Sequence, residues 1–202
     1  MRVPSYPSLG KAHTREVTGI SDGGTMMQEV NTERHLLVCG EINADRATGI
    51  VEALESLKDS DEPIYISLCS PGGEAQPSLW VAEYIRNLPN WVIGIAGGDC
   101  SSAALLIFAA CDERWAFPGT GFYSHPGIWE VPISNKLQAH AAVTQVAHLE
   151  TSCDVIQRPA FPKMSKKQYS VWATEDHFFT VPEAVSYGLV HKVLAKTKKV
   201  KP

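Results

Sequence analysis

The order of its apolar segments is the feature that most restricts how this 202-residue chain can fold. Strand-like runs and helical patterns follow one another in turn along the first half of the chain: 36–39, 43–57, 64–69, 77–88, 91–96 and 101–111. Strands that alternate with helices pair in parallel through right-handed crossovers, and the helices then cover the sheet. The sequence therefore predicts an α/β fold.

Local signals support these elements. Asn43 is suited to cap a helix, because its side-chain oxygen can accept a hydrogen bond from the first helical turn. The apolar residues that follow it fall on one helical face: Ala47, Ile50, Val51, Leu54 and Leu57. Pro77 suits the first turn of the next helix. Gly97 and Gly98 are expected to follow the third strand as a turn.

The second half of the chain is expected to contain shorter strands and one long helix. Strand-like segments lie at 114–117 and 121–124, and a helix is predicted from about 134 to 157, ended by the prolines beyond it. Its length predicts an arm that projects from the core. A strand near 178–179, a helix at 182–187 closed by a glycine, and a strand at 189–194 complete the pattern.

Three regions differ in composition. Residues 1–33 are polar, with little periodicity, and are expected to form a flexible arm or a processed leader. Residues 34–195 are long enough for one domain with a full core. Residues 196–202 form a basic tail that is expected to be solvated.

Composition restricts the class of protein. Hydrophobic residues make up 44% of the chain and charged residues 20%, as in globular proteins. The net charge of −4 gives no broad basic field for nucleic acid, and the longest apolar stretches are too short to span a membrane. Five cysteines without CxxC spacing fit a reducing compartment, so the cytoplasm is expected.

Neither a metal nor a cofactor is predicted. His140 and His148 lie eight positions apart on the long helix, and Thr144 between them is no strong ligand. Gly97-Gly98 belongs to no GxGxxG pattern and no Gly-Lys-Ser/Thr follows it, so a phosphate site has little support.

Three residues stand in contexts that suit a serine hydrolase. Ser102 lies where a strand gives way to a helix, His125 ends a short strand, and Asp176 precedes an apolar strand. A serine there can attack, a histidine can take its proton near neutral pH, and a carboxylate can orient the imidazole. Each residue alone has a commoner explanation: a helix cap, a surface histidine and a turn carboxylate. Ser101 is the alternative nucleophile.

A glycine-rich turn adds the fourth component. Ser70-Pro71-Gly72-Gly73 directly follows the apolar strand at 64–69. Two adjacent glycines let the backbone bend so that an N–H can face a developing oxyanion. Nucleophile, base, orienting carboxylate and anion donor together predict an enzyme that attacks acyl groups.

These motifs resemble those of the proteolytic subunit of the caseinolytic Clp protease, ClpP. The resemblance covers about residues 35–194. Four segments carry it, in the order and spacing of that family: Ser70-Pro71-Gly72-Gly73, Gly98-Asp99-Cys100-Ser101-Ser102, Phe117-Pro118 with Ser124-His125, and Asp176 with Pro182-Glu183-Ala184 and Tyr187-Gly188-Leu189.

The resemblance implies a fold and a set of roles. The fold is the ClpP/crotonase-like α/β spiral of repeated β-β-α units, with helix 134–157 as a protruding handle. Ser102 is implied as nucleophile, His125 as base and Asp176 as orienter. The backbone N–H groups of Gly73 and Ala103 are implied to form the oxyanion hole. An extended substrate is expected beside the turn, at Ser70, Pro71, Gly72, Gly73 and Glu74.

The resemblance also implies an assembly and partners. Two stacked heptameric rings, a homo-oligomeric tetradecamer, would enclose the active sites, and the handle helix would join the rings. A ring-shaped AAA+ unfoldase of the ClpX, ClpA or ClpC type would feed unfolded polypeptides into the chamber.

The chain departs from the family pattern at several positions. Ala103 and Ala104 stand where Met and Gly commonly follow the nucleophile, and Pro126-Gly127 replaces the usual Gln-Pro after the histidine. Glu175 stands where the family usually has an arginine that forms ion pairs between rings. This substitution reverses a charge at the ring–ring contact, so both one ring and two rings remain open.

Three alternative functions are compatible with the sequence. The first is a peptidase that needs no unfoldase, for instance one that matures a viral shell. The second is a catalytically inactive subunit that completes mixed rings, although such a subunit would be free to lose Ser102, His125 and Asp176. The third is a crotonase-type enzyme acting on coenzyme A thioesters, which needs no Ser-His-Asp set.

Overall fold

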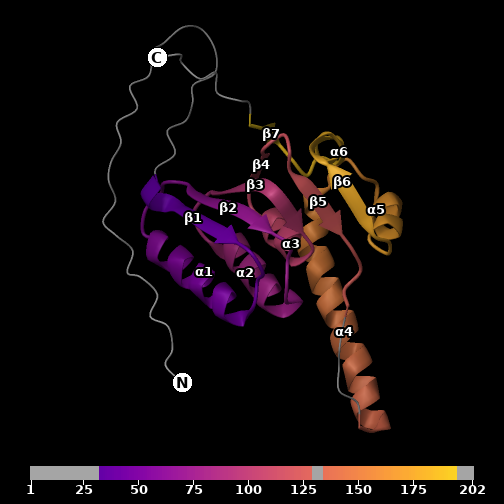
Figure 1. Ribbon diagram of the computed structural model, residues 1–202. Coiled ribbons are helices and arrows are strands. Elements are labelled where there is room, and N and C mark those ends of the chain that lie inside the picture. Colours follow the sequence, from indigo (N-terminus) through magenta and orange to yellow (C-terminus); the bar gives the residue numbers. More distant parts are fainter. Residues whose placement is uncertain (1–31, 129–133, 195–202) are drawn as a thin grey trace, which may run out of the picture.

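The computed structural model describes residues 32–128 and 134–194, and Figure 1 shows them as one sheet with helices packed around it. Seven strands form the sheet: β1 (His35–Cys39), β2 (Ile64–Ser70), β3 (Val92–Ser101), β4 (Glu113–Ala116), β5 (Gly121–Ser124), β6 (His177–Thr180) and β7 (Lys192–Val193). The main path runs β1-β2-β3-β4-β7, and every pairing along it is parallel. The predicted α/β fold is confirmed.

The helices connect these strands. Six α-helices are described: α1 (Ala44–Leu57), α2 (Ala75–Asn87), α3 (Ala103–Ala110), α4 (Lys136–Gln157), α5 (Lys166–Trp172) and α6 (Val181–Tyr187). Two short 3-10 helices, η1 (Thr32–Arg34) and η2 (Arg158–Ala160), complete the described elements. The Asn43 side chain accepts a 3.0 Å hydrogen bond from the Arg46 N–H, which confirms the predicted cap of α1.

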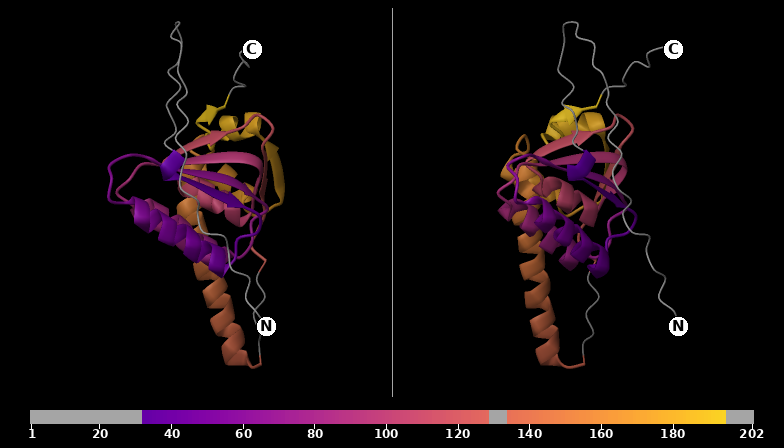
Figure 2. Two further views of the ribbon diagram at one scale, coloured as in Figure 1. Left: turned by 60° about the vertical axis from the view of Figure 1, so that its left-hand side comes forward. Right: turned by 90° about the vertical axis from the view of Figure 1, so that its left-hand side faces the viewer.

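The sheet is apolar on both faces, but the two faces differ. Ile64, Ile66 and Leu68 of β2 point to the helix side, where they join the main core. Tyr65, on the same strand, points to the other side and packs with Ile93, Ile95 and Trp115 in a smaller cluster. This alternation follows from the two-residue period of a strand. The helices α1 and α2 cover the first face (Figure 2).

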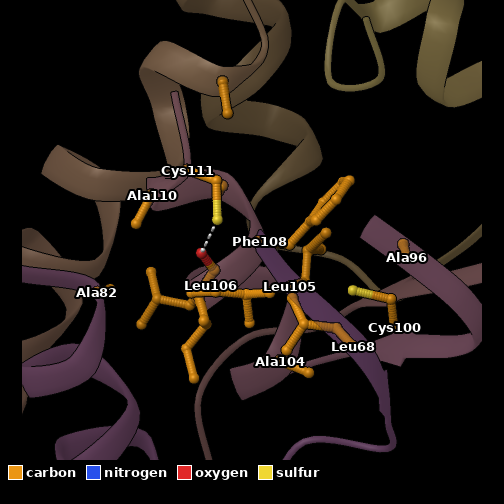
Figure 3. Close-up of a cluster of buried hydrophobic side chains, with 14 of the residues drawn as sticks. Leu68, Ala82, Ala96, Cys100, Ala104, Leu105, Leu106, Phe108, Ala110 and Cys111 are labelled. Atoms are coloured by element: carbon orange, nitrogen blue, oxygen red, sulfur yellow. Dashed lines mark hydrogen bonds between the residues drawn. The ribbon is translucent and has the colours of Figure 1, made fainter. Parts of the chain in front are cut away.

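Helix α3 lies at the centre of the core. All eight of its residues are buried, as expected for a helix that is apolar on every side. Figure 3 shows its side chains between β2, β3 and α2, with the Cys111 thiol donating a 3.5 Å hydrogen bond to the Ile107 carbonyl. A Cβ at Gly94 of β3 would lie 2.9 Å from the Cys111 sulfur, so the glycine lets α3 approach the sheet closely.

Strand β3 is longer than predicted. Gly97 and Gly98, expected to form a turn after the strand, lie within it, and the strand continues to Ser101. The extension pairs with β5 in parallel, from Asp99–Gly121 to Ser101–Tyr123. Strand β5 in turn pairs with β6 in antiparallel orientation. The correction matters because the extension places Ser102 beside the β5–β6 ribbon.

Helix α4 projects from the body, as predicted, and begins two residues later than expected. Asn135 caps it, and the views in Figure 2 show that most of its length stands clear of the sheet. Only Ala142 and Ile156 are buried among its residues. No described helix has the length and apolar character needed to cross a bilayer.

The C-terminal elements agree in part with the prediction. Helix α6 ends at Gly188, whose φ of +86° closes it in the left-handed conformation. Helix α5 was not predicted, although Ser165 and Gln168 form the capping box that opens it. The strand expected at 189–194 is short, because β7 spans only Lys192–Val193.

Candidate active site

Ser102 lies at the turn between β3 and α3, in a conformation that side chains rarely adopt. Its φ is 52° and its ψ is −122°, and it is the only non-glycine residue with positive φ in the described parts of the chain. Such a conformation costs about 1–3 kcal/mol and persists only where the surroundings enforce it. Here the Ser102 N–H donates a 2.7 Å hydrogen bond to the Tyr123 carbonyl, which ties the turn to β5.

The Ser102 hydroxyl does not cap α3, although the residue occupies the N-cap position. Instead, its oxygen lies 2.7 Å from Nε2 of His125. The commoner explanation for a serine here, a helix cap, therefore does not describe this side chain. Ser101 is buried and its hydroxyl donates to the Asp99 carboxylate, so the contact with His125 favours Ser102 over Ser101 as the candidate nucleophile.

The other nitrogen of the His125 ring determines its tautomer. Nδ1 lies 2.7 Å from the carbonyl oxygen of Pro126, which can only accept a hydrogen bond. Nδ1 therefore carries the proton in the neutral ring, and Nε2 presents its lone pair to the Ser102 hydroxyl. This is the tautomer that a general base for Ser102 requires.

Asp176 lies close to this pair but makes a different contact. In the antiparallel ribbon Ser124 is opposite His177, so the next position in register places His125 opposite Asp176. Among the described residues, however, the His125 Nδ1 bonds to the Pro126 carbonyl, and burial followed by the charge of Asp176 raises the pKa of the neighbouring Tyr123. The structure thus brings Ser102 and His125 into contact and leaves Asp176 beside them.

The Gly72-Gly73 turn packs against the Ser102 turn. A Cβ at Gly72 would lie 2.8 Å from the Ser102 Cβ and 2.9 Å from the Ala103 nitrogen. A Cβ at Gly73 would lie 2.1 Å from the Ile42 carbonyl oxygen. Both glycines have positive φ, 101° and 146°. Neither position has room for a side chain, which explains the adjacent glycines.

The two N–H groups expected to bind an oxyanion are available. Two backbone hydrogen bonds hold the turn against Ile42, and neither involves the Gly73 N–H. The Ile42 N–H donates to the Gly72 carbonyl and the Glu74 N–H donates to the Ile42 carbonyl, both at 2.8 Å. Within the described residues, the backbone hydrogen bonds involve neither the Gly73 N–H nor the Ala103 N–H. Their role in an oxyanion hole remains a prediction.

A cleft of about 800 Å³ opens beside Ser102 and His125. The turn supplies Gly73 and Glu74 to its wall, whereas Ser70 is buried and accepts a hydrogen bond from the Gly72 N–H. Pro71 borders a separate hollow near β5 and β6. Of the five residues predicted to bind substrate, Gly73 and Glu74 therefore line this cleft.

The cleft also contains residues that the sequence analysis did not identify. Its wall on the side of α3 and α4 is formed by Leu106, Val146, Leu149, Glu150, Cys153 and Asp154. The helical periodicity of α4 could have identified an inward face, but not that this face borders Ser102. No group of three or more His, Cys, Asp and Glu side chains in the described residues is arranged to hold a metal ion.

Comparison with a solved structure identifies the class of fold. A mutant of ClpP1 from Listeria monocytogenes superimposes with a TM-score of 0.66, at 24% sequence identity, over 80% of this chain and 91% of that one. The parallel sheet, the buried α3 and the projecting α4 therefore define a ClpP-like fold.

Sequence comparison identifies the family. The model of the Clp protease family matches residues 21–197. The ATP-dependent Clp protease proteolytic subunit 2 of Pseudomonas aeruginosa is 30% identical over 88% of this chain and 89% of its own length. The proteolytic subunit 2 of Treponema denticola is 27% identical over 89% of this chain and 90% of its own length. The chain belongs to the Clp protease family, whose members are peptidases.

Proposed function

We propose that this chain is the proteolytic subunit of an ATP-dependent Clp protease and acts as a serine-type endopeptidase. The observation that carries the proposal is the 2.7 Å contact between the Ser102 hydroxyl and Nε2 of His125, at a serine with strained backbone that does not cap its helix. A nucleophile and a base within hydrogen-bond reach are the core of covalent acyl transfer.

The proposed reaction has two stages. The Ser102 oxygen attacks the carbonyl carbon of a peptide bond while Nε2 of His125 takes the hydroxyl proton. The Gly73 and Ala103 N–H groups donate to the oxyanion, a contribution on the order of 3 kcal/mol for one donor. The His125 imidazolium then protonates the leaving amine, an acyl-enzyme forms, and water activated by His125 releases the second product.

The substrates proposed are unfolded polypeptides. An extended chain lying beside residues 70–75 can pair through backbone hydrogen bonds, which depend little on sequence. Leu106, Val146 and Leu149 line the neighbouring cleft, so apolar side chains of the substrate have a surface to pack against. No cofactor takes part in the proposed reaction.

The proposed partner is an AAA+ unfoldase, and the proposed assembly is a pair of heptameric rings. The relatives from P. aeruginosa and T. denticola are named as subunits of ATP-dependent proteases. These names are the basis on which we propose that a partner ATPase acts with this chain. The cytoplasm remains the predicted location.

Labelling with a fluorophosphonate, followed by peptide mapping of the adduct, tests the proposal. We expect one adduct on Ser102, which is lost in Ser102→Ala and in His125→Ala. Ser101→Ala is the matched control, because it removes the adjacent hydroxyl and should leave the adduct in place. An adduct on Ser101 would move the nucleophile by one position. The absence of any adduct, with intact folding by circular dichroism, would favour the inactive ring subunit.

A further inference from the structure

Two cysteines lie opposite one another on the neighbouring strands β1 and β2. Cys39 is the last residue of β1, and in the parallel register its partner on β2 is Cys69. Both are exposed, and both thiols are free. Val38 and Leu68, one position earlier on each strand, are buried in the main core, so both cysteine side chains point to the opposite face of the sheet. Each thiol therefore has a second thiol beside it, on a face that solvent reaches.

The spacing of the two strands suits a disulfide. Neighbouring strands lie about 4.8 Å apart, and the Cα atoms of a disulfide-bonded pair are usually about 4.4–6.8 Å apart. With both thiols free, the Cys69 sulfur lies over Gly98 of β3, where a Cβ would be 3.1 Å from it. Rotation about the Cα–Cβ bond turns this sulfur from β3 toward Cys39 on β1. The nearby Cys100 does not compete, because it is fully buried in the main core, on the other face.

We propose that Cys39 and Cys69 form a reversible disulfide when the protein meets a low-molecular-weight disulfide such as oxidised glutathione. The thiolate of one cysteine attacks a sulfur of the oxidant and releases one glutathione. The other cysteine then attacks the protein sulfur of the mixed disulfide and releases the second glutathione. Two cysteine thiols are oxidised, the glutathione disulfide is reduced to two thiols, and the two cysteine protons pass to the released glutathione. Since the bond is exposed, reducing thiols reach it and open it again.

The segments that follow the two cysteines lead to the proposed oxyanion donor. The Gly40 N–H donates a 3.0 Å hydrogen bond to the Cys69 carbonyl, and the two segments pair again at Ile42 and Gly73. The Cβ atoms of a disulfide are about 3.8 Å apart, which is about 1 Å less than the spacing of neighbouring strands. Closing the bond therefore draws the two segments together just before they reach Ile42 and Gly73.

The glycine turn transmits such a movement, because it is held at both ends. The Gly72 N–H donates a 3.1 Å hydrogen bond to the Ser70 hydroxyl, which ties the turn to the end of β2, next to Cys69. A Cβ at Gly72 would lie 2.8 Å from the Ser102 Cβ, so the turn is already in close contact with the candidate nucleophile. A displacement of about 1 Å at a reacting group can lower a rate by about 100-fold. The disulfide therefore slows the reaction of Ser102, an effect that rests on the proposed function and adds its regulation.

Oxidation of the full-length protein, in the assembly that it forms, tests the bond and its effect. The wild type is equilibrated with mixtures of reduced and oxidised glutathione, free thiols are blocked with N-ethylmaleimide, and a tryptic digest is mapped without reduction. Trypsin cuts after Arg46 and Lys58, so the two cysteines fall on separate peptides. We expect one cross-linked pair, Cys39 with Cys69, lighter by two hydrogens than the free peptides. Fluorophosphonate labelling of Ser102 should slow by about tenfold or more and recover after dithiothreitol.

Cys39→Ser is the matched variant, because it retains every other thiol and cannot form the bond. It should label at the wild-type rate with and without oxidised glutathione. Cys153 is half-buried and lines the cleft, so its oxidation is a second route to slower labelling. Slowing through Cys153 would persist in Cys39→Ser. In Cys153→Ser, by contrast, the slowing through the proposed disulfide and its recovery should both remain.

Three results would overturn the inference. One is glutathione bound separately to Cys39 and Cys69 with no cross-link between them. Another is a bond from Cys69 to Cys100, or a covalent dimer on a non-reducing gel, because either places the partner thiol elsewhere. The third is a cross-linked wild type that labels as fast as the reduced protein. If Ser102 labels in neither redox state, the proposed function fails, while the peptide map still decides whether the disulfide forms.

Discussion

A substitution at Gly73 tests whether its backbone N–H takes part in the proposed oxyanion hole. Gly73→Ala places a methyl group 2.1 Å from the Ile42 carbonyl oxygen, at a φ of +146° that disfavours any side chain. The turn must therefore shift, and the N–H proposed to bind the oxyanion moves with it. We expect labelling of Ser102 to slow by about 100-fold, the loss typical of one oxyanion donor.

Gly49→Ala is the matched control for this substitution. Gly49 lies in the middle of α1, and a Cβ there would meet no heavy atom within 4 Å. Alanine favours the helix over glycine by about 0.5–1 kcal/mol, so this variant should melt at the same or a higher temperature and label at the wild-type rate. Wild-type labelling in Gly73→Ala would show that the turn does not take part in the chemistry.

The sequence was more informative about which residues form the candidate site than about their contacts. Ser102, His125 and Gly73 could be placed near one another because each lies where a strand ends, and those ends meet at one edge of a parallel sheet. The position of Asp176 beside this pair could not be predicted in this way. It depends on the register of β5 against β6, which no motif records.

The buried Arg34 connects several secondary-structure elements. Arg34 is 7% exposed, and its guanidinium donates to the carbonyls of Leu57, Glu62 and Pro63 at 2.7, 3.0 and 3.3 Å. It thereby joins the start of β1 to the end of α1 and to the loop before β2. Arg34→Met should destabilise the fold by about 2–3 kcal/mol, because these carbonyls lose a charged donor.

Arg34→Lys distinguishes geometry from charge. A single ammonium group cannot donate to all three carbonyls that the planar guanidinium of Arg34 reaches. We therefore expect Arg34→Lys to lose about as much folding stability as Arg34→Met, with Tm lower by about 5 °C or more in both variants. The control is Arg86→Lys, since Arg86 is exposed and, among the described residues, donates to one carbonyl, that of Val155, at 2.8 Å. Equal Tm values for Arg34→Lys and the wild type would show that charge alone suffices at this position.

Among the secondary-structure elements, apolar periodicity predicted correctly those helices whose bounds tertiary contacts do not change. Helix α1 and the long α4 follow their apolar spacing and caps closely. Strand β3 departs from the prediction because it continues through its two glycines, and the residues after them, Asp99 to Ser101, pair with β5. Helix α5 was missed because its seven residues give too few turns for a periodic signal, although its capping box was readable in the sequence.

The stability of the whole molecule should depend on pH near neutrality. Burial lowers the pKa of His35, and burial followed by the charge of Arg114 lowers the pKa of His191, both from about 6.5. In acid below that value the unfolded chain binds more protons than the folded one, so stability falls as the pH falls. We expect Tm to decrease between about pH 7.5 and pH 5.5.

The histidines can be removed to check this dependence. In the double variant His35→Gln/His191→Gln the decrease in Tm over the same interval should become smaller. His148→Gln is the control, because His148 is exposed on α4. A slope that is unchanged in the double variant would assign the pH dependence to other groups.

The projecting helix α4 makes the assembly testable. Leu137 is 78% exposed and Val143 is 69% exposed, so the projecting part of α4 presents apolar side chains that a second copy can cover. If α4 joins two rings, Val143→Glu places a charge in that contact and should reduce the particle mass by half in analytical ultracentrifugation. Thr144→Glu adds the same charge to an exposed polar position next to it and should have a smaller effect.

Because Glu175 replaces the usual arginine, the salt dependence of the proposed ring–ring contact tells whether apolar groups or ion pairs hold it. Glu175 is exposed and lies 3.8 Å from Nε2 of His177, and no lysine or arginine in the described parts of the chain forms an ion pair with it. A ring–ring contact held by apolar groups on α4 should strengthen with salt, whereas one held by ion pairs should weaken. We expect wild-type double rings to persist at high salt and Val143→Glu rings to stay single. Dissociation of the wild type by salt would instead assign the contact to charged residues. An undivided particle in Val143→Glu would remove α4 from the ring–ring contact.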